Sequence, residues 1–267
     1  MDKFDIIVIG HVGFENILNG PKPVTYCGGA GYYTSLAASL FSKNVGLVSR
    51  IGSDFDISKL KKLGINLQGV KLIEGGLSPQ FRLRYNPLNY EQRDFECDWN
   101  VAADITPLDI PREYFSAKYF HIATAPPKQQ LEWIKYIRKH SDAKISIDTL
   151  EQFIEWWKED VIDALSAVDM VFINRRESEL IGKLKSHKTM VIKKGPDGAD
   201  YSVNGKIIYS TPAPKSVMKD PTGSGDIVAG VFLALMAQTN DYEKSLKEAV
   251  KTASKSIQDY GVDFLIK

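Results

Sequence analysis

Two glycines and a carboxylate lie close together near the C-terminal end of the chain, in the segment Asp220-Pro221-Thr222-Gly223-Ser224-Gly225-Asp226. The apolar run that follows, Ile227–Leu233, predicts a buried helix. The free amides of its first turn and the positive end of its dipole would form an anion site, and phosphate is the natural guest. In this turn the carboxylate of Asp226 is expected to stay ionised and to accept a proton. The motif therefore indicates phosphoryl transfer to a hydroxyl, with Asp226 as catalytic base and the amides of Gly223, Ser224 and Gly225 as an anion hole.

Two better known phosphate-binding loops do not match this segment. A P-loop requires a lysine after its last glycine, and no lysine follows Gly225. A dinucleotide fingerprint needs a strand-helix-strand unit and an acidic partner after it, which this position does not provide. Taken alone, the motif leaves one alternative open, a glycine-rich helix cap with an acidic first turn.

The segment resembles the signature Asp-Thr-x-Gly-Ala-Gly-Asp of the PfkB/ribokinase family of carbohydrate kinases. Pro221 replaces the threonine, with Thr222 next, and Ser224 replaces the alanine. The resemblance extends from the first predicted strand to Gly261, and the chain looks similar to the archaeal-type or cyclitol-kinase-like subgroup of the family. It implies an α/β fold, a ribokinase-like three-layer sandwich with a mostly parallel central sheet, helices on both faces and a small β lid. It also implies ATP and Mg²⁺ as cofactors and a single domain over residues 1–267.

A second glycine block, Gly28-Gly29, precedes a predicted helix and resembles the substrate motif Gly-Gly-x-x-x-Asn of that family. Tyr33 stands where ribokinase-like members often place an asparagine that holds sugar hydroxyls, which favours a cyclitol over a simple pentose. Glu15 takes the position of a family aspartate that accepts hydrogen bonds from substrate hydroxyls, and Asn16 is an alternative donor and acceptor. The resemblance therefore assigns substrate binding to Glu15, Asn16, Gly28, Gly29 and Tyr33. Without it, Gly28-Gly29 is better explained as a turn that only starts a helix.

The metal and nucleotide residues are expected after two later strands. Asn174 and Glu177 share one face of a helical first turn, which suits either water-mediated Mg²⁺ binding or a plain capping box. The resemblance to the family motif Asn-x-x-Glu favours the metal. The loop Gly195-Pro196-Asp197-Gly198 resembles the nucleotide-side loop of the family, and Lys193 or Lys194 would meet the phosphates. The ATP-binding set implied is Lys193, Gly195, Gly198 and Thr222.

Two polar residues at strand ends stay outside the predicted site. Asp148 occupies a place where the family often has an aspartate near the cleft floor, but it would equally cap the helix that follows. His11 follows the first strand, and a lone histidine at a strand end is more often structural.

The elements that must position these residues alternate between strand and helix. Short apolar runs predict strands at 4–10, 45–50, 118–123, 144–148, 169–174 and 189–194, and helical patterns lie at 28–41, 57–63, 128–140, 160–167, 175–181 and 249–260. This alternation predicts a parallel sheet with ligands beyond its carboxyl ends. Regions 14–26 and 70–98 break it, and we expect them to form the strands of the small lid, with a turn at Asn86-Pro87-Leu88-Asn89.

Composition excludes several classes of partner. The chain has 267 residues, of which 43% are hydrophobic and 25% charged, with a formal net charge of +1, so neither nucleic acid nor a membrane is an expected partner. Two cysteines are too few for a disulfide framework or a zinc site. The start of the chain has no basic and apolar leader, and the expected location is the cytoplasm. The expected partners are a small polyol substrate and a second subunit that pairs through the lid edge.

The predicted activity is ATP-dependent transfer of the γ-phosphate to a hydroxyl of a small sugar or cyclitol. A nucleoside kinase is the first alternative, because Tyr32, Tyr33 and the aromatic lid could stack a base. A catalytically silent sugar or nucleotide sensor on the same fold is the second.

Overall fold

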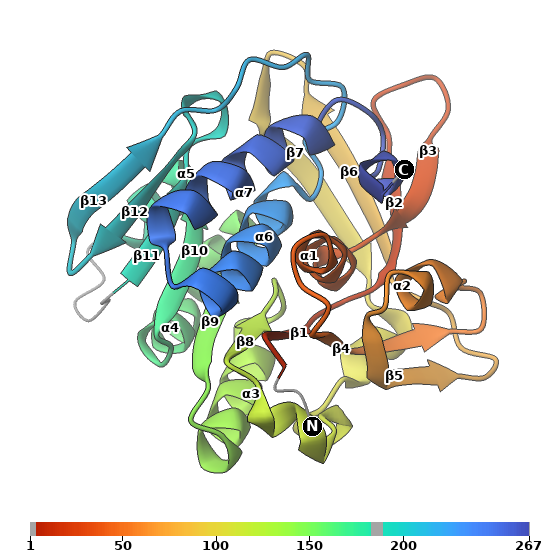
Figure 1. Ribbon diagram of the computed structural model, residues 1–267. Helices are drawn as coiled ribbons and strands as arrows, with labels where there is room; N and C mark the ends of the chain where they lie inside the picture. The colour runs from red at the N-terminus through yellow and green to blue at the C-terminus, as the bar shows by residue number, and fades with distance from the viewer. Residues whose placement is uncertain (1–3, 183–188, 267) are drawn as a thin grey trace.

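The computed structural model describes residues 4–182 and 189–266, which form one large and one small β-sheet with helices around the large one (Figure 1). Residues 1–3, 183–188 and 267 of the predicted domain lie outside the described residues. Within the described ranges, no helix has both the length and the apolar character needed to cross a membrane.

The large sheet has the strand order β13-β12-β11-β10-β9-β8-β1-β4-β5. Its strands are β1 (Ile6–Ile9), β4 (Val45–Gly52), β5 (Asn66–Ile73), β8 (Tyr119–Ile122), β9 (Lys144–Asp148), β10 (Met170–Asn174), β11 (Thr189–Lys193), β12 (Ala199–Val203) and β13 (Lys206–Thr211). From β11 to β5 in this order, neighbouring strands pair in parallel. Strands β12 and β13 add an antiparallel hairpin next to β11, at one edge of the sheet.

Helices cover both faces of the large sheet, which explains why the central strands are apolar on both sides. The helices are α1 (Ala30–Ser39), α2 (Ser58–Lys62), α3 (Pro127–His140), α4 (Glu151–Ser166), α5 (Arg175–Ile181), α6 (Ser224–Thr239) and α7 (Tyr242–Ser256). One core joins Ile6 and Val8 of β1 to α1, α6 and α7, and a second core joins Ile7 and Ile9 to α3 and α4. Alternate residues of one strand thus serve both cores.

Two boundaries differ from the sequence expectation. Helix α4 begins at Glu151 rather than at residue 160, and Trp157 inside it has non-helical φ and ψ angles of −141° and 49°. That kink interrupts the helical periodicity of the apolar residues, which explains why the first part of the helix was missed. The last helix, α7, begins at Tyr242 rather than at residue 249 and ends at Ser256.

The small sheet has the order β3-β2-β6-β7 and consists of β2 (Gly13–Ile17), β3 (Val24–Gly28), β6 (Gln80–Asn86) and β7 (Asn89–Asp98). The predicted turn connects β6 and β7. The expectation for region 70–98 needs one correction, because residues 70–73 belong to β5 in the large sheet. An edge strand of a parallel sheet alternates like a lid strand, so periodicity alone does not separate the two.

The parallel strands bring their carboxyl ends to one edge of the large sheet, next to the small sheet. Asp148, Asn174 and Lys193 are the last residues of β9, β10 and β11, and the Cα atoms of Asn174 and Lys193 are register partners. Polar side chains far apart in the sequence therefore meet at this edge, as expected for open α/β sheets.

Candidate active site

The predicted anion motif forms the amino end of α6. Gly223 caps the helix with φ at 74°, a left-handed conformation that favours glycine. A Cβ atom built on Gly223 would lie 2.4 Å from the ring of Tyr33. Backbone conformation and packing therefore both require glycine here.

The amides of the predicted anion hole are not equivalent. The amide of Ser224 donates a hydrogen bond to the carbonyl oxygen of Pro221 at 3.2 Å. Within the described ranges, no hydrogen bond joins the amides of Gly223 and Gly225 to another residue. The geometry therefore leaves two of the three predicted amides free for an anion.

Asp226 lies in the first turn of α6 and lines a cavity with a volume of about 730 Å³. Desolvation, with a smaller contribution from the nearby Asp148, raises the pKa of Asp226 to about 7, against the opposing effects of Lys193 and Arg93. This differs from the expectation that the carboxylate stays ionised. Loss of water around this half-buried carboxyl outweighs the helix dipole. A pKa near neutrality suits a general base.

Three of the five predicted substrate residues, Glu15, Gly29 and Tyr33, line the cavity, whereas Gly28 packs against two of them without lining it. Glu15 Oε1 accepts the amide of Gly29 at 3.1 Å. A Cβ atom on Gly28 would lie 2.2 Å from the Glu15 side chain and 2.6 Å from the hydroxyl of Tyr33. Burial raises the pKa of Glu15 to about 8, so a protonated carboxyl predominates at neutral pH. Among the described residues, Oε2 of Glu15 and the hydroxyl of Tyr33 are buried and have no hydrogen-bond partner.

Asn16 does not belong to this cluster. Its Nδ2 donates to Gln80 Oε1 at 3.1 Å, its Oδ1 accepts from Thr25 at 2.7 Å, and Asn16 does not line the cavity. Neighbouring residues of a strand point to opposite faces, so Glu15 and Asn16 cannot both face the site.

Asn174 and Glu177 form a reciprocal capping box at the start of α5. Glu177 Oε2 accepts the amide of Asn174 and Asn174 Oδ1 accepts the amide of Glu177, both at 2.8 Å. Both side chains also line the cavity, and burial raises the pKa of Glu177 to about 7. The capping box uses only Oε2 of Glu177, so the second carboxylate oxygen is not engaged in it. In the described part of the chain, no group of three or more His, Cys, Asp or Glu is arranged to hold a metal directly.

The predicted nucleotide residues separate into two groups. Lys193, Gly195 and Thr222 line the cavity. Gly198 does not, because its φ of 88° places it against Thr211, whose carbonyl oxygen would be 1.9 Å from an added Cβ. Lys194 turns away from the cavity and forms an ion pair with Asp200 at 2.5 Å.

The small sheet is hydrogen-bonded to the segment that precedes α6. The hydroxyl of Tyr85 on β6 and Oγ1 of Thr222 form a hydrogen bond of 2.8 Å. Tyr26 on β3 donates a hydrogen bond to Asp220, which also accepts from Thr222 at 2.6 Å. These contacts hold the small sheet over the amino end of α6.

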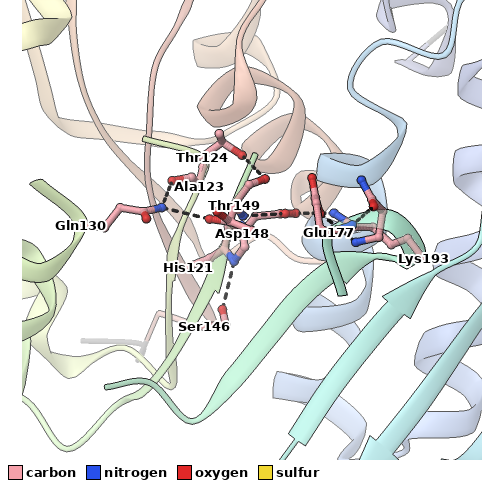
Figure 2. A network of polar contacts seen from close by, with 10 residues as sticks. His121, Ala123, Thr124, Gln130, Ser146, Asp148, Thr149, Glu177 and Lys193 are labelled. Atoms are coloured by element: carbon pink, nitrogen blue, oxygen red, sulfur yellow. Dashed lines mark hydrogen bonds and ion pairs between the residues drawn. The ribbon is translucent and has the colours of Figure 1, made fainter. Parts of the chain in front are cut away.

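Sequence reasoning missed Arg93 and left Asp148 outside the site. Arg93 on β7 lines the cavity, lies 5.9 Å from the ring centre of Tyr85 and interacts electrostatically with Glu177 and Glu15. Arg93 shares the partly buried face of an alternating strand with Phe95. A charged residue on that face was the sequence signal that could have placed Arg93 in the site. Asp148 is buried and binds Lys193 at the cavity floor (Figure 2).

Aromatic side chains form one wall of the cavity. The ring of His11 lies 4.6 Å from that of Trp99, and Phe81 lies 6.2 Å from Trp99 and 6.3 Å from Phe95. Burial lowers the pKa of His11 to about 4, so this histidine is neutral at physiological pH. The wall offers flat apolar surfaces next to the polar Glu15 and Tyr33.

Comparison with known proteins gives a consistent relationship over the whole chain. The family model described as pfkB family carbohydrate kinase matches residues 2–267. A cytidine kinase from Thermococcus kodakarensis is 28% identical over 282 residues, which cover 96% of this chain and 97% of that protein.

Solved structures with the same fold include kinases that differ in their phosphate acceptors. The Methanocaldococcus jannaschii nucleoside kinase, an archaeal member of the ribokinase family, has a TM-score of 0.80 at 24% identity and covers 98% of this chain and 94% of its own. A putative ribokinase II from E. coli in complex with ATP and Mg²⁺ has a TM-score of 0.80 at 16% identity and covers 97% and 94%. The expected ribokinase-like α/β fold is confirmed.

Proposed function

This chain belongs to the pfkB family of carbohydrate kinases, and within that family we propose that it transfers the γ-phosphoryl group of ATP to a hydroxyl of a nucleoside. Asp226 accepts the proton of the attacking hydroxyl. The free amides at the amino end of α6 stabilise the charge that develops on the transferred group. The observation that carries the proposal is the position of Asp226 in the cavity next to these amides.

The cavity supports a nucleoside over a free sugar or cyclitol. A free sugar offers mostly hydroxyls, whereas Phe81, Phe95 and Trp99 give the cavity an aromatic lining against which a base can pack. The unpartnered atoms of Glu15 and Tyr33 lie on the same side and would bind ribose hydroxyls. Because the carboxyl of Glu15 is largely protonated at neutral pH, it can both donate and accept.

The names of the relatives agree with this choice. The curated relatives include a cytidine kinase and two archaeal nucleoside kinases, each covering 96% of this chain. A putative 1-phosphofructokinase also matches, so the sugar or cyclitol acceptor predicted from sequence stays a candidate for the same screen. We take cytidine as the first acceptor to test.

The residues at the nucleotide end suit ATP and a hydrated metal. Lys193 and Gly195 line the cavity next to α6 and would meet the phosphates, while Thr222 would orient them. Glu177 and Asn174 would hold the water shell of Mg²⁺, which when bound neutralises phosphate charge. Arg93 would add a second positive charge from the lid side.

The test is a screen of ADP release with ATP and Mg²⁺ over cytidine, uridine, adenosine, inosine, ribose, hexoses, hexose phosphates and cyclitols. We expect saturable turnover with one or more nucleosides and none with free sugars. Turnover only with a sugar or cyclitol would overturn the nucleoside assignment and keep the kinase. ATP binding without ADP release over the whole panel would favour the silent sensor.

A further inference from the structure

A buried ion pair crosses the floor of the cavity. Nζ of Lys193 donates to Oδ2 of Asp148 at 2.6 Å, and the two side chains are 15% and 4% exposed. The residues end β11 and β9, so the pair spans the carboxyl end of β10, which lies between those strands. Figure 2 shows Asp148, Glu177 and Lys193 pointing toward one another.

The carboxylate of Asp148 is fixed from several directions. Its Oδ1 accepts the amide of Thr149 at 2.9 Å. Its backbone carbonyl accepts Nε2 of Gln130 at 2.9 Å, and the same Nε2 donates to the carbonyl of Ala123 at 3.0 Å (Figure 2). One amide group thus ties the ends of β8 and β9 together. Asp148 is therefore a rigid anchor rather than a mobile surface carboxylate.

The ammonium of Lys193 lies against the anion motif. A Cβ atom built on Gly225 would be only 2.9 Å from Nζ. An ammonium group has three donors, and Asp148 accepts one of them. The remaining donors lie next to Gly225, whose amide is free, and a phosphate bound there would accept them.

Asp148 and Lys193 have opposite effects on the base. The charged groups around Asp226 are Glu15 on β2, Arg93 on β7, Asp148 on β9, Glu177 on α5 and Lys193 on β11. Asp148 raises the pKa of Asp226 and Lys193 lowers it. In a cavity with little water, a fixed charge at short range acts more strongly than in solution.

We propose that Asp148 is a positioning residue for phosphoryl transfer, which holds the ammonium of Lys193 at the amino end of α6 so that it contacts the group in transfer. The inference rests on the proposed kinase function. Asp148 itself does not touch the phosphate, because both of its carboxylate oxygens are already bonded. Its contribution is preorganisation, since a cation already in place needs no rearrangement during the reaction.

The first test compares Asp148→Asn with Lys193→Met. Asparagine keeps the volume and an acceptor for the amide of Thr149 but removes the charge. We expect Asp148→Asn to lower kcat roughly 10- to 100-fold without raising KM for ATP. Lys193→Met should weaken ATP binding roughly tenfold in titration calorimetry as well as lower kcat. Thermal unfolding of both variants identifies a loss of fold.

The second readout is the acid limb of the pH–rate profile. Removing the negative charge of Asp148 should move this limb to lower pH, and removing the positive charge of Lys193 should move it to higher pH. A purely structural role would not produce shifts of opposite sign. Lys193→Arg, which keeps the charge, should return the limb toward that of the wild type.

Lys194→Met is the matched control, since it removes the next lysine from an ion pair with Asp200 outside the cavity. It should leave kcat and the acid limb unchanged. Wild-type kcat and an unmoved limb in Asp148→Asn would overturn the inference while leaving the kinase intact. An inactive wild type in the acceptor screen would count against the proposed function, and unchanged ATP binding in Lys193→Met would then overturn the inference independently.

Discussion

Asp226 is the proposed base, and its surroundings raise the pKa of its carboxyl group. The motif predicted the residue and its place at a helix start, but not its pKa, which depends on desolvation by lid, sheet and helix together. In the free protein, protonation of Asp226 competes with its proposed role as a base. The acid limb of kcat/KM should therefore lie near pH 7, with activity falling as pH drops.

Asp226→Asn tests the base directly. The substitution keeps the size of the side chain and removes its proton affinity, so kcat should fall roughly 10²–10⁴-fold while ATP binding changes little. The measurement is steady-state ADP release together with ATP titration calorimetry. Turnover at the wild-type rate would show that another group accepts the proton.

Gly225→Ala tests the contact between the anion motif and Lys193. The added Cβ would lie 2.9 Å from Nζ and would displace the ammonium, because the end of a lysine side chain moves easily. We expect kcat to fall roughly tenfold with no loss of stability, since alanine is favoured over glycine in a helix by about 1 kcal/mol.

A double-mutant cycle isolates the cause of the Gly225→Ala effect. In a Lys193→Met background there is no ammonium to displace, so the added methyl group should change kcat little. Equal losses in both backgrounds would show that alanine disturbs the anion hole itself rather than Lys193.

At the scale of elements, the small sheet is docked by side-chain hydrogen bonds to the catalytic loop. Tyr85 bonds to Thr222, and Tyr26 bonds to Asp220. Sequence alternation predicted strands in both lid regions, but it placed residues 70–73 in the lid instead of in β5. The partners of an alternating strand are set by its contacts in three dimensions, which periodicity does not contain.

Tyr85→Phe should loosen the lid without changing its packing. Loss of the buried hydrogen bond to Thr222 costs roughly 1 kcal/mol, so KM for the acceptor should rise roughly fivefold. Amide hydrogen exchange should increase in β6 and β7 and stay unchanged in α6. Tyr209→Phe on β13, outside the cavity, is the control. Unchanged exchange in the lid would mean that other contacts hold it.

At the scale of the whole molecule, the cavity contains buried carboxyl groups, and their desolvation lowers the free energy of unfolding when they ionise. The pKa of Glu15 rises from 4.5 to about 8 on folding because of burial. A group whose pKa is raised in the folded state contributes stability that is present below pH 4.5 and is lost as pH rises toward 8. The buried site and the pH dependence of stability are therefore linked.

Glu15→Gln should flatten the pH dependence of unfolding. In the wild type, Glu15 should lower the free energy of unfolding by up to about 1.4 kcal/mol per pH unit between roughly pH 5 and 8. Urea denaturation at several pH values measures this slope. Glu132→Gln, exposed on α3, should leave the slope unchanged. A wild-type slope in Glu15→Gln would contradict the shifted pKa.

Pairing of a second subunit through the lid edge stays a prediction.

Local periodicity and short spacing were enough to predict the strand-helix alternation and the residues of the α6 motif, and the resemblance of the motifs to a known family implied the ribokinase-like class. The sequence did not determine that Glu15 faces the cavity and Asn16 the opposite side, that Ser224 uses its amide in a turn, or that Asp148 holds Lys193. Nor did it indicate that Arg93 enters the site from the lid. These points depend on which strand ends meet at one edge of the sheet and on how far burial removes water from the charges there, and both follow from contacts between residues distant in the sequence.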